Sequence, residues 1–186
     1  MHADIDRVLI SRQQIQHRVA ELAEQITRDH TPTGGSEGPE VTIVPILTGA
    51  MIFACDLMRH IPIAMKIGLM TVSSYPGTAT KSQGVTITGH KVGDIHGRHV
   101  LLLDDILDSG NTIRAVVPMI RDMGAATVRT CVLLRKDRPE ARATHVDYVG
   151  FDIPDEFVVG YGLDYDDYYR NLPEVVTLKR EVYEGK

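Results

Sequence analysis

The stretch that most constrains how this chain can fold is HVLLLDDILDSGNT, from His99 to Thr112. Its apolar part, Val100 to Leu103, is typical of a central parallel strand that is covered on both faces. Two adjacent carboxylates, Asp104 and Asp105, interrupt this apolar run. The next residues are mostly small and polar, and they suit a tight loop before a helix: Asp108, Ser109, Gly110, Asn111 and Thr112. We therefore expect a buried strand, an acidic pair and a loop that opens a helix.

The loop from Asp108 to Thr112 is suited to binding a phosphate. A loop of small residues before a helix presents backbone N–H groups and hydroxyls to an anion, and the helix dipole adds to the attraction. The glycine is not followed by the lysine of a Walker A loop, and the chain has no G-x-G-x-x-G. Because Asp104 and Asp105 would repel a bare anion, we expect them to bind sugar hydroxyls or a Mg²⁺ ion that accompanies the ligand. A phosphorylated ribose offers both.

The same run resembles the ribose-phosphate signature of the type I phosphoribosyltransferases: an apolar strand, two acidic residues, two apolar residues and D-S-G-x-T. The resemblance implies that Asp104 and Asp105 hold the ribose hydroxyls and Mg²⁺. It also implies that Asp108 is the catalytic residue, a proton acceptor at N7 of the base, and that Ser109 to Thr112 bind the 5-phosphate. An ordinary buried strand with a polar turn would have no use for this set of carboxylates beside D-S-G-N-T.

Length and composition place the chain among ordinary globular proteins. At 186 residues it is about one domain long, and we expect a single domain over 1–186. Hydrophobic residues make up 43% and charged residues 24%, which excludes a wholly disordered chain. The net charge of −5 argues against a general nucleic-acid binder. Without an apolar run of ~20 residues or a signal-peptide pattern, we expect no membrane association and a cytoplasmic location.

The cysteines and histidines do not suggest a disulfide or a zinc site. Cys55 and Cys131 lie far apart in apolar segments, so we expect two buried thiols. The eight histidines show no paired spacing with cysteines or carboxylates, and we assign no zinc site.

Strands alternate with helices along the chain, which predicts an α/β fold whose parallel sheet holds its ligand at the carboxyl ends of the strands. Ser11 and Gln14 form a capping-box pattern before a helix. The apolar face of that helix is Ile15, Val19, Leu22, Ala23 and Ile26. The expected strands are Val8 to Ile10, Val41 to Leu47, Ile63 to Ser73 and Thr127 to Leu134. The further helices are Met51 to about His60 and Thr112 to Met123, the latter ending at Gly124.

Two more segments are candidates for ligand contacts. Thr48 and Gly49 lie between a strand and a helix, where small residues permit a ligand to approach the backbone. In the family this position is the pyrophosphate loop, usually with lysine-glycine, and its contacts are chiefly backbone amides. A long polar stretch of about 75–91 follows Ser74 and Tyr75, and the resemblance implies that this pair begins a mobile loop over the reacting centre. A plain solvent-exposed excursion is the alternative.

The segment from His145 to Pro173 resembles the C-terminal segment of hypoxanthine-guanine phosphoribosyltransferases, with F-D-I-P-D-E-F-V-V-G-Y-G-L-D-Y in this chain. The resemblance implies that Lys136 donates to the 6-oxo group of the purine, and that the remaining contacts come from this segment. In it, Phe157 stacks on the base, Val158 contacts the base through its backbone, Asp164 reaches the metal or the guanine amino edge, and Arg170 meets pyrophosphate. A lysine at a strand end is otherwise a solvated residue, and we expect Lys136 to be solvated when no base is bound.

The resemblance implies a type I phosphoribosyltransferase fold, with a mainly parallel central sheet flanked by helices and a small hood from about 1–10 and 150–186. It implies a purine salvage enzyme that transfers 5-phosphoribosyl from phosphoribosyl pyrophosphate to N9 of hypoxanthine or guanine, with Mg²⁺ and as a homodimer or homotetramer. Two other readings are possible. A pyrimidine attenuation regulator carries the same signature but needs a basic RNA-binding face. A receiver domain has an acidic pair at strand ends but leaves D-S-G-N-T unexplained.

Overall fold

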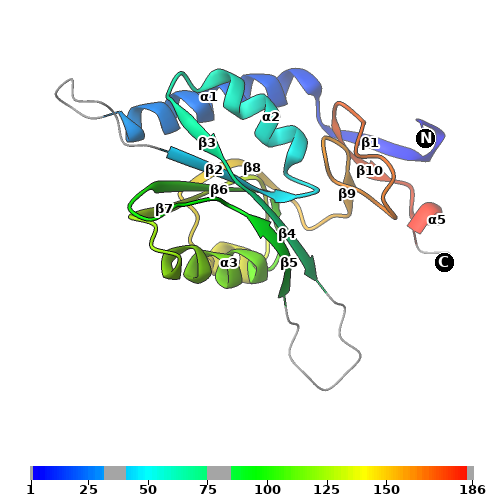
Figure 1. The fold of residues 1–186 in the computed structure, drawn as a ribbon. Coiled ribbons are helices and arrows are strands. Elements are labelled where there is room, and N and C mark those ends of the chain that lie inside the picture. The colour runs from blue at the N-terminus through cyan, green and yellow to red at the C-terminus, as the bar shows by residue number, and fades with distance from the viewer. Residues whose placement is uncertain (1, 32–40, 75–84, 184–186) are drawn as a thin grey trace.

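The computed structural model describes residues 2–31, 41–74 and 85–183, and it has a larger and a smaller sheet (Figure 1). In chain order its elements are η1 (His2–Asp4), β1 (Ile5–Ile10), α1 (Arg12–His30), β2 (Val41–Leu47), α2 (Met51–His60), β3 (Met65–Ile67), β4 (Leu69–Ser74), β5 (Val85–Lys91), β6 (His99–Leu107), α3 (Asn111–Asp122), β7 (Thr127–Lys136), α4 (Pro139–Ala143), β8 (Tyr148–Ile153), β9 (Val158–Val159), β10 (Val175–Leu178) and α5 (Arg180–Tyr183). No helix in these ranges has both the length and the apolar character that a membrane span needs.

The larger sheet has the strand order β5-β4-β2-β6-β7-β8, and β3 also pairs with β2. The pairs β2–β4, β2–β6, β6–β7 and β7–β8 are parallel, and only β5 among these strands pairs antiparallel. The α/β class with a mainly parallel central sheet is therefore confirmed. β6 lies in the middle and is paired on both sides, which explains why its first half is a continuous apolar run.

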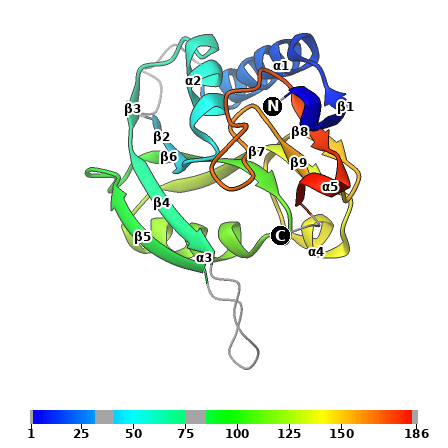
Figure 2. The same cartoon turned by 90° about the vertical axis from the view of Figure 1, so that its right-hand side faces the viewer.

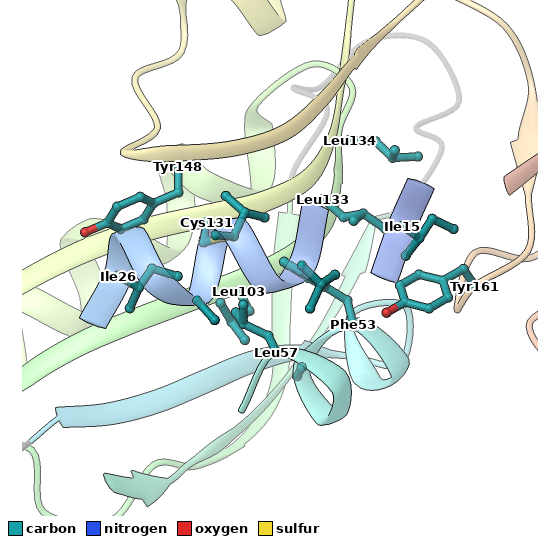
Figure 3. Close-up of a cluster of buried hydrophobic side chains, with 14 of the residues drawn as sticks. Ile15, Ile26, Phe53, Leu57, Leu103, Cys131, Leu133, Leu134, Tyr148 and Tyr161 are labelled. Carbon is teal, nitrogen blue, oxygen red and sulfur yellow. The ribbon is translucent and has the colours of Figure 1, made fainter. Parts of the chain in front are cut away.

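Helices cover both faces of this sheet, with α1 and α2 on one side and α3 on the other (Figure 1). The predicted capping box is present, because Ser11 accepts from the Gln14 backbone and the Gln14 side chain accepts from the Ser11 N–H. All the predicted apolar residues of this helix are buried. Figure 3 shows Ile15 and Ile26 of α1 together with Leu103 and Cys131 of the sheet. This packing fixes the sheet from which the candidate site projects.

The smaller sheet has the order β1-β10-β9 and is antiparallel. Its strands come from both ends of the chain, and it lies beside the carboxyl ends of the large sheet's strands (Figures 1 and 2). Arg7 and Glu156 join the two ends through hydrogen bonds of 2.6 and 2.7 Å. We call this sheet, together with α5 and the segment that joins β8 to β10, the hood.

The expected hood boundary at about 150 is wrong by a few residues. Tyr148–Ile153 is β8, which pairs in parallel with β7 of the large sheet. Gly150 lies so close to β7 that a Cβ there would be 2.4 Å from the Leu133 carbonyl oxygen. Arg18 of α1 also donates to the Gly150 carbonyl at 2.8 Å. The hood therefore begins after Ile153.

Two further expectations need correction. The expected strand from Ile63 to Ser73 is divided into β3 and β4 at Gly68, where a Cβ would come within 2.9 Å of the Val92 backbone. The expected loop of about 75–91 is shorter at its end, because residues 85–91 form β5 and pair antiparallel with β4. Tyr75 and the rest of the loop to residue 84 lie outside the described residues. The mobility expected for this loop stays a prediction.

The two cysteines differ in exposure. Cys131 is buried, as expected, but Cys55 is exposed, so that half of the expectation is wrong. On α2 the buried residues are Phe53, Ala54 and Leu57, and Cys55 falls off this face. Both thiols are free.

Candidate active site

The candidate site lies where the carboxyl ends of β2, β6 and β7 meet the start of the hood (Figure 2). Ligands of open α/β sheets bind at such carboxyl ends. The backbone of the hood lies very close to the backbone of the turn after β2. A Cβ on Gly162 of the hood would be 2.2 Å from the Gly49 carbonyl oxygen, at the turn after β2.

Asp104 and Asp105 form an acid pair within β6, which continues through them to Leu107. Asp104 is buried, with 6% of its surface exposed. Burial raises the pKa of both carboxyl groups, and the neighbouring charge of Asp105 raises that of Asp104 further. At Asp105 the positive charge of Arg170 partly opposes this rise in pKa. Within 2–31, 41–74 and 85–183, no lysine or arginine forms an ion pair with either carboxylate.

The turn after β2 presses against this acid pair. A Cβ built on Gly49 would lie 1.8 Å from Asp105 Oδ2, so only glycine fits here while Asp105 keeps its position. Thr48 beside it is exposed, and the Leu47–Thr48 peptide is cis. The structure shows that a carboxylate closely approaches the small residues of this turn, and the approach of a ligand to its backbone stays a prediction.

The expected phosphate loop turns directly into α3. Gly110 is the residue before the helix, with φ +78°, and a Cβ on it would be 2.1 Å from Thr144 Oγ1. The helix begins at Asn111, one residue earlier than expected. Arg114 in its first turn donates to the Ser109 carbonyl at 2.9 Å and to Asn111 Oδ1 at 2.7 Å. Arg114 therefore holds the shape of the loop, a contact that the sequence analysis missed.

Four side chains of alternating charge form a closed ring beside the loop, and we call them the ionic ring: Asp108, Lys136, Asp155 and Arg138. Lys136 Nζ lies 3.5 Å from Asp108 Oδ1 and 3.4 Å from Asp155 Oδ1. Arg138 Nη1 lies 2.6 Å from Asp108 Oδ1, and its Nε lies 3.2 Å from Asp155 Oδ2. The formal charges of the ring sum to zero.

Lys136 is not solvated, contrary to the expectation from the sequence. It is part of β7, which extends to Lys136 rather than ending at Leu134. Its side chain is only 13% exposed. Its ammonium group is paired with two carboxylates that come from separate segments, Asp108 and Asp155.

The remaining predicted residues belong to the hood. Phe157 is 39% exposed and touches Tyr165 and Tyr183, with ring centroids 5.7 and 5.0 Å away. Val158 is buried in β9, and only 5% of its surface is exposed. A ring that is partly exposed has a surface free to stack on a planar ligand.

Asp164 and Arg170 form an ion pair of 2.8 Å. Arg170 also donates to the Gly162 carbonyl at 2.8 Å. Asp164 accepts from the Asp167 backbone at 2.9 Å. These two predicted residues are therefore together, at the segment that abuts the turn after β2.

The structure brings most of the predicted site residues to one edge of the large sheet, but it shows two groups rather than one. Ser74 is the last residue of β4, and Tyr75 lies outside the described residues. Arg138 and Asp155 were missed, because the sequence holds no local signal that two residues from separate loops will meet. The expected metal ligands do not gather on their own: no three His, Cys, Asp or Glu side chains in the described ranges form a candidate metal site.

A carboxylate pair without a third ligand nevertheless fits Mg²⁺. This ion is usually held by one or two carboxylates together with waters and substrate phosphates rather than by a complete protein cage. The carboxylates of Asp104, which is buried, and Asp105, which is partly buried, form no ion pair with a side chain of the described residues and are a donor set of that kind.

Comparisons with known proteins agree with this geometry. The family model of the phosphoribosyl transferase domain matches residues 10–166. Among curated relatives, the hypoxanthine-guanine phosphoribosyltransferase of Mycobacterium bovis is 43% identical over 182 residues, which cover 97% of this chain and 90% of that protein. That of Streptococcus pneumoniae is 41% identical and is covered to 97%, as is this chain. The crystal structure of a hypoxanthine phosphoribosyltransferase from Staphylococcus aureus has a TM-score of 0.89 at 37% identity, covering 98% of this chain and 96% of the other.

Proposed function

The chain belongs to the phosphoribosyl transferase family, and from this membership we propose that it is a purine salvage enzyme. It transfers the 5-phosphoribosyl group of phosphoribosyl pyrophosphate to N9 of hypoxanthine or guanine, giving IMP or GMP and pyrophosphate. The type I phosphoribosyltransferase fold and the names of the relatives support this reaction.

The observation that carries the proposal is the double position of Asp108. It is the first residue of the phosphate-type loop, and it is also 3.5 Å from Lys136. One edge of the sheet therefore offers a loop suited to a phosphate and, directly beside it, a hydrogen-bond donor and an acceptor, Lys136 and Asp108. A ligand that joins a phosphorylated ribose to a purine would touch both.

The sugar and pyrophosphate are assigned to the acid pair and its neighbours. Asp104 and Asp105 accept from the ribose hydroxyls and hold Mg²⁺, which, when bound, neutralises the charge of the leaving pyrophosphate. Thr48 and Gly49 present backbone N–H groups to the pyrophosphate, and Arg170 adds positive charge there. Ser109 to Thr112 bind the 5-phosphate at the start of α3.

The base is assigned to the ionic ring and the hood. Lys136 donates to the 6-oxo group, and Asp108 accepts at N7, where its negative charge also stabilises an oxocarbenium-like transition state. Phe157 stacks on the base, Val158 contributes its backbone, and Asp164 faces the metal or the guanine amino edge. An ammonium group donates and never accepts, so adenine, with a 6-amino donor, is disfavoured.

The test is a spectrophotometric assay of each purine with phosphoribosyl pyrophosphate, with Mg²⁺ and with excess chelator. We expect turnover of hypoxanthine or guanine that chelation abolishes, and no turnover of adenine. Conversion of uracil in place of a purine would contradict the proposal. It would favour the alternative, a pyrimidine attenuation regulator, which no observation now supports. The homodimer or homotetramer expected from the resemblance is tested by the mass of the protein in solution.

A further inference from the structure

We infer that Arg138 is a positioning residue for the purine: it holds Asp108 and Asp155 so that Lys136 is free to leave them for the base. The inference rests on the proposed function and adds a residue to which neither the sequence nor the resemblance assigns a role. It depends on the way in which the ionic ring is built.

Arg138 connects three separate parts of the site. It lies two residues after β7, its Nη1 donates to Asp108 just after β6, and its Nε faces Asp155, which precedes the hood strand β9. Lys136 contacts the same two carboxylates from the other side of the ring, at 3.5 and 3.4 Å. Each carboxylate therefore has two cationic partners, and each cation has two carboxylate partners.

This arrangement matters at the moment when the base binds. If Lys136 turns toward a 6-oxo group, it gives up contacts with both carboxylates. Asp108 and Asp155 are each 46% exposed, so solvent screens part of this loss, but each carboxylate still loses a favourable charge interaction when its partner leaves. Because Arg138 keeps both contacts, the ammonium group can be transferred to the ligand without leaving either carboxylate unpaired.

The shape of the arginine side chain suits this task. Its planar fork presents different N–H groups to the two carboxylates, at 2.6 and 3.2 Å, whereas the single ammonium group of Lys136 lies farther from both, at 3.5 and 3.4 Å. Without Arg138, Lys136 would be the only cation of the ring and would be held there more firmly. The affinity for the base should therefore fall, while the phosphoribosyl pyrophosphate site, with its acid pair, should be little affected.

Arg142 offers a matched control. It lies on α4, the short helix that Arg138 precedes, and its side chain forms ion pairs with Asp137 and Asp152 but with neither carboxylate of the ring. Its side chain is 43% exposed, against 39% for Arg138. Loss of either arginine removes one surface cation with two carboxylate partners, so only the position relative to Lys136 differs.

The experiment compares the parent, Arg138→Met, Arg138→Lys and Arg142→Met, each with its melting temperature and its steady-state constants for both substrates. We expect the KM for hypoxanthine to rise about fivefold to tenfold in Arg138→Met and less in Arg138→Lys, with the KM for phosphoribosyl pyrophosphate within about twofold. Arg142→Met should keep both KM values. In Lys136→Gln, adding Arg138→Met should raise the hypoxanthine KM by less than about twofold, because the two residues act together.

The outcomes separate the inference from the function on which it rests. If the parent does not use hypoxanthine or guanine, the proposed function fails. If the parent is active but Arg138→Met keeps the parent's KM for hypoxanthine, only the inference fails. It also fails if Arg138→Met and Arg142→Met have the same effect, or if the effects of Lys136→Gln and Arg138→Met multiply. Should Arg138→Met not fold, an unchanged KM in Arg138→Lys would overturn the inference.

Discussion

Two groups of charges that lie close together along the chain differ in whether their carboxylates have cationic partners: the acid pair within β6, and the ionic ring, whose Asp108 comes three residues after Asp105 and directly after this strand. Asp104 and Asp105 are adjacent carboxylates whose pKa values burial raises, and no side chain in the described ranges forms an ion pair with them. Asp108 is accompanied by Lys136 and Arg138 in a ring that also includes Asp155. The carboxylates of the first group have no cationic side chain of the described residues paired with them, whereas the charges of the second group are balanced by one another.

The difference follows the ligands proposed for each group. A pyrophosphate donor arrives with Mg²⁺, so a carboxylate pair without its own cation is suited to it. A purine is neutral and brings no counter-ion, so the charges that recognise it are balanced beforehand by the protein itself. On the proposed assignment, the charges that recognise the base are paired before it binds, and the acid pair is completed by the Mg²⁺ that accompanies the donor.

The largest expected effect comes from Asp108, the residue that joins the two groups. Asp108→Asn should lower the turnover number by about a hundredfold or more, since a group that accepts a proton or stabilises developing positive charge contributes roughly 10²–10⁴-fold. Binding of phosphoribosyl pyrophosphate should change far less. The measurement is a single-turnover rate beside a binding titration.

Asp155→Asn is the control for Asp108, because it removes the other carboxylate of the same ring. It should lower turnover much less, since Asp155 does not belong to the phosphate loop. A single-turnover rate of Asp108→Asn within about twofold of the parent, a barrier change under ~0.5 kcal/mol, would show that the assignment is wrong.

The next effect concerns Lys136 and the choice of base. A charge-assisted hydrogen bond contributes roughly 1.5–3 kcal/mol, so Lys136→Gln should lose about tenfold to a hundredfold in kcat/KM with hypoxanthine or guanine. It should also discriminate less against adenine, because an amide can accept as well as donate. Since Arg138 still pairs with both carboxylates, the melting temperature should change by no more than about 4 °C.

The exposed Lys66 on β3 supplies the comparison, because Lys66→Gln removes a charge away from the ring. Its kcat/KM should equal that of the parent. If Lys136→Gln uses hypoxanthine equally well and still rejects adenine, the ring is only a structural feature and the purine assignment fails.

The smallest expected effect is a change in the melting temperature when a carboxylate of the acid pair is replaced. Because the pKa of Asp104 is raised in the folded protein, this carboxyl favours folding at low pH, and that contribution is lost as the pH rises through the folded-state pKa. Asp104→Asn removes the cost of an ionised buried carboxylate. In buffer with chelator, the variant should melt about 2–4 °C higher than the parent at pH 8, with a smaller gap at pH 5, while its activity is lost.

Asp94→Asn is the matched change at an exposed carboxylate, which caps the His96 backbone at 3.0 Å, and it should leave the melting temperature unaltered. Loss of several degrees in Asp104→Asn would mean that this carboxylate stabilises the fold. The proposed difference between an uncompensated acid pair and a charge-balanced ionic ring would then not hold.

The sequence was sufficient for those features that depend on neighbours along the chain. Val41–Leu47 and Met51–His60 have the predicted bounds, since each is a continuous apolar or periodic run. The acid pair and its loop were also found, because their residues are consecutive. Cys55 could have been placed correctly from helical periodicity, since it falls beside the buried face of α2.

The features that the sequence did not predict come from contacts between distant segments. The division of the strand at Gly68 depends on Val92, and the ring depends on Arg138 and Asp155 meeting across two loops. Lys136 was expected to be solvated because strand-end lysines usually are, whereas its side chain is only 13% exposed and is paired with two carboxylates from distant segments. The local sequence showed which residue types are present but not which of them would neutralise one another.

The most direct test of the division between the two groups is calorimetric titration of phosphoribosyl pyrophosphate with Mg²⁺ into the parent, Asp104→Asn/Asp105→Asn and Lys136→Gln. The acid-pair variant should bind at least about tenfold more weakly than the parent, because it loses charge-assisted contacts. The affinity of Lys136→Gln should stay within about threefold of the parent's. An equal loss in both variants, or a larger loss in Lys136→Gln, would contradict the assignment of the acid pair to the donor and of the ionic ring to the base.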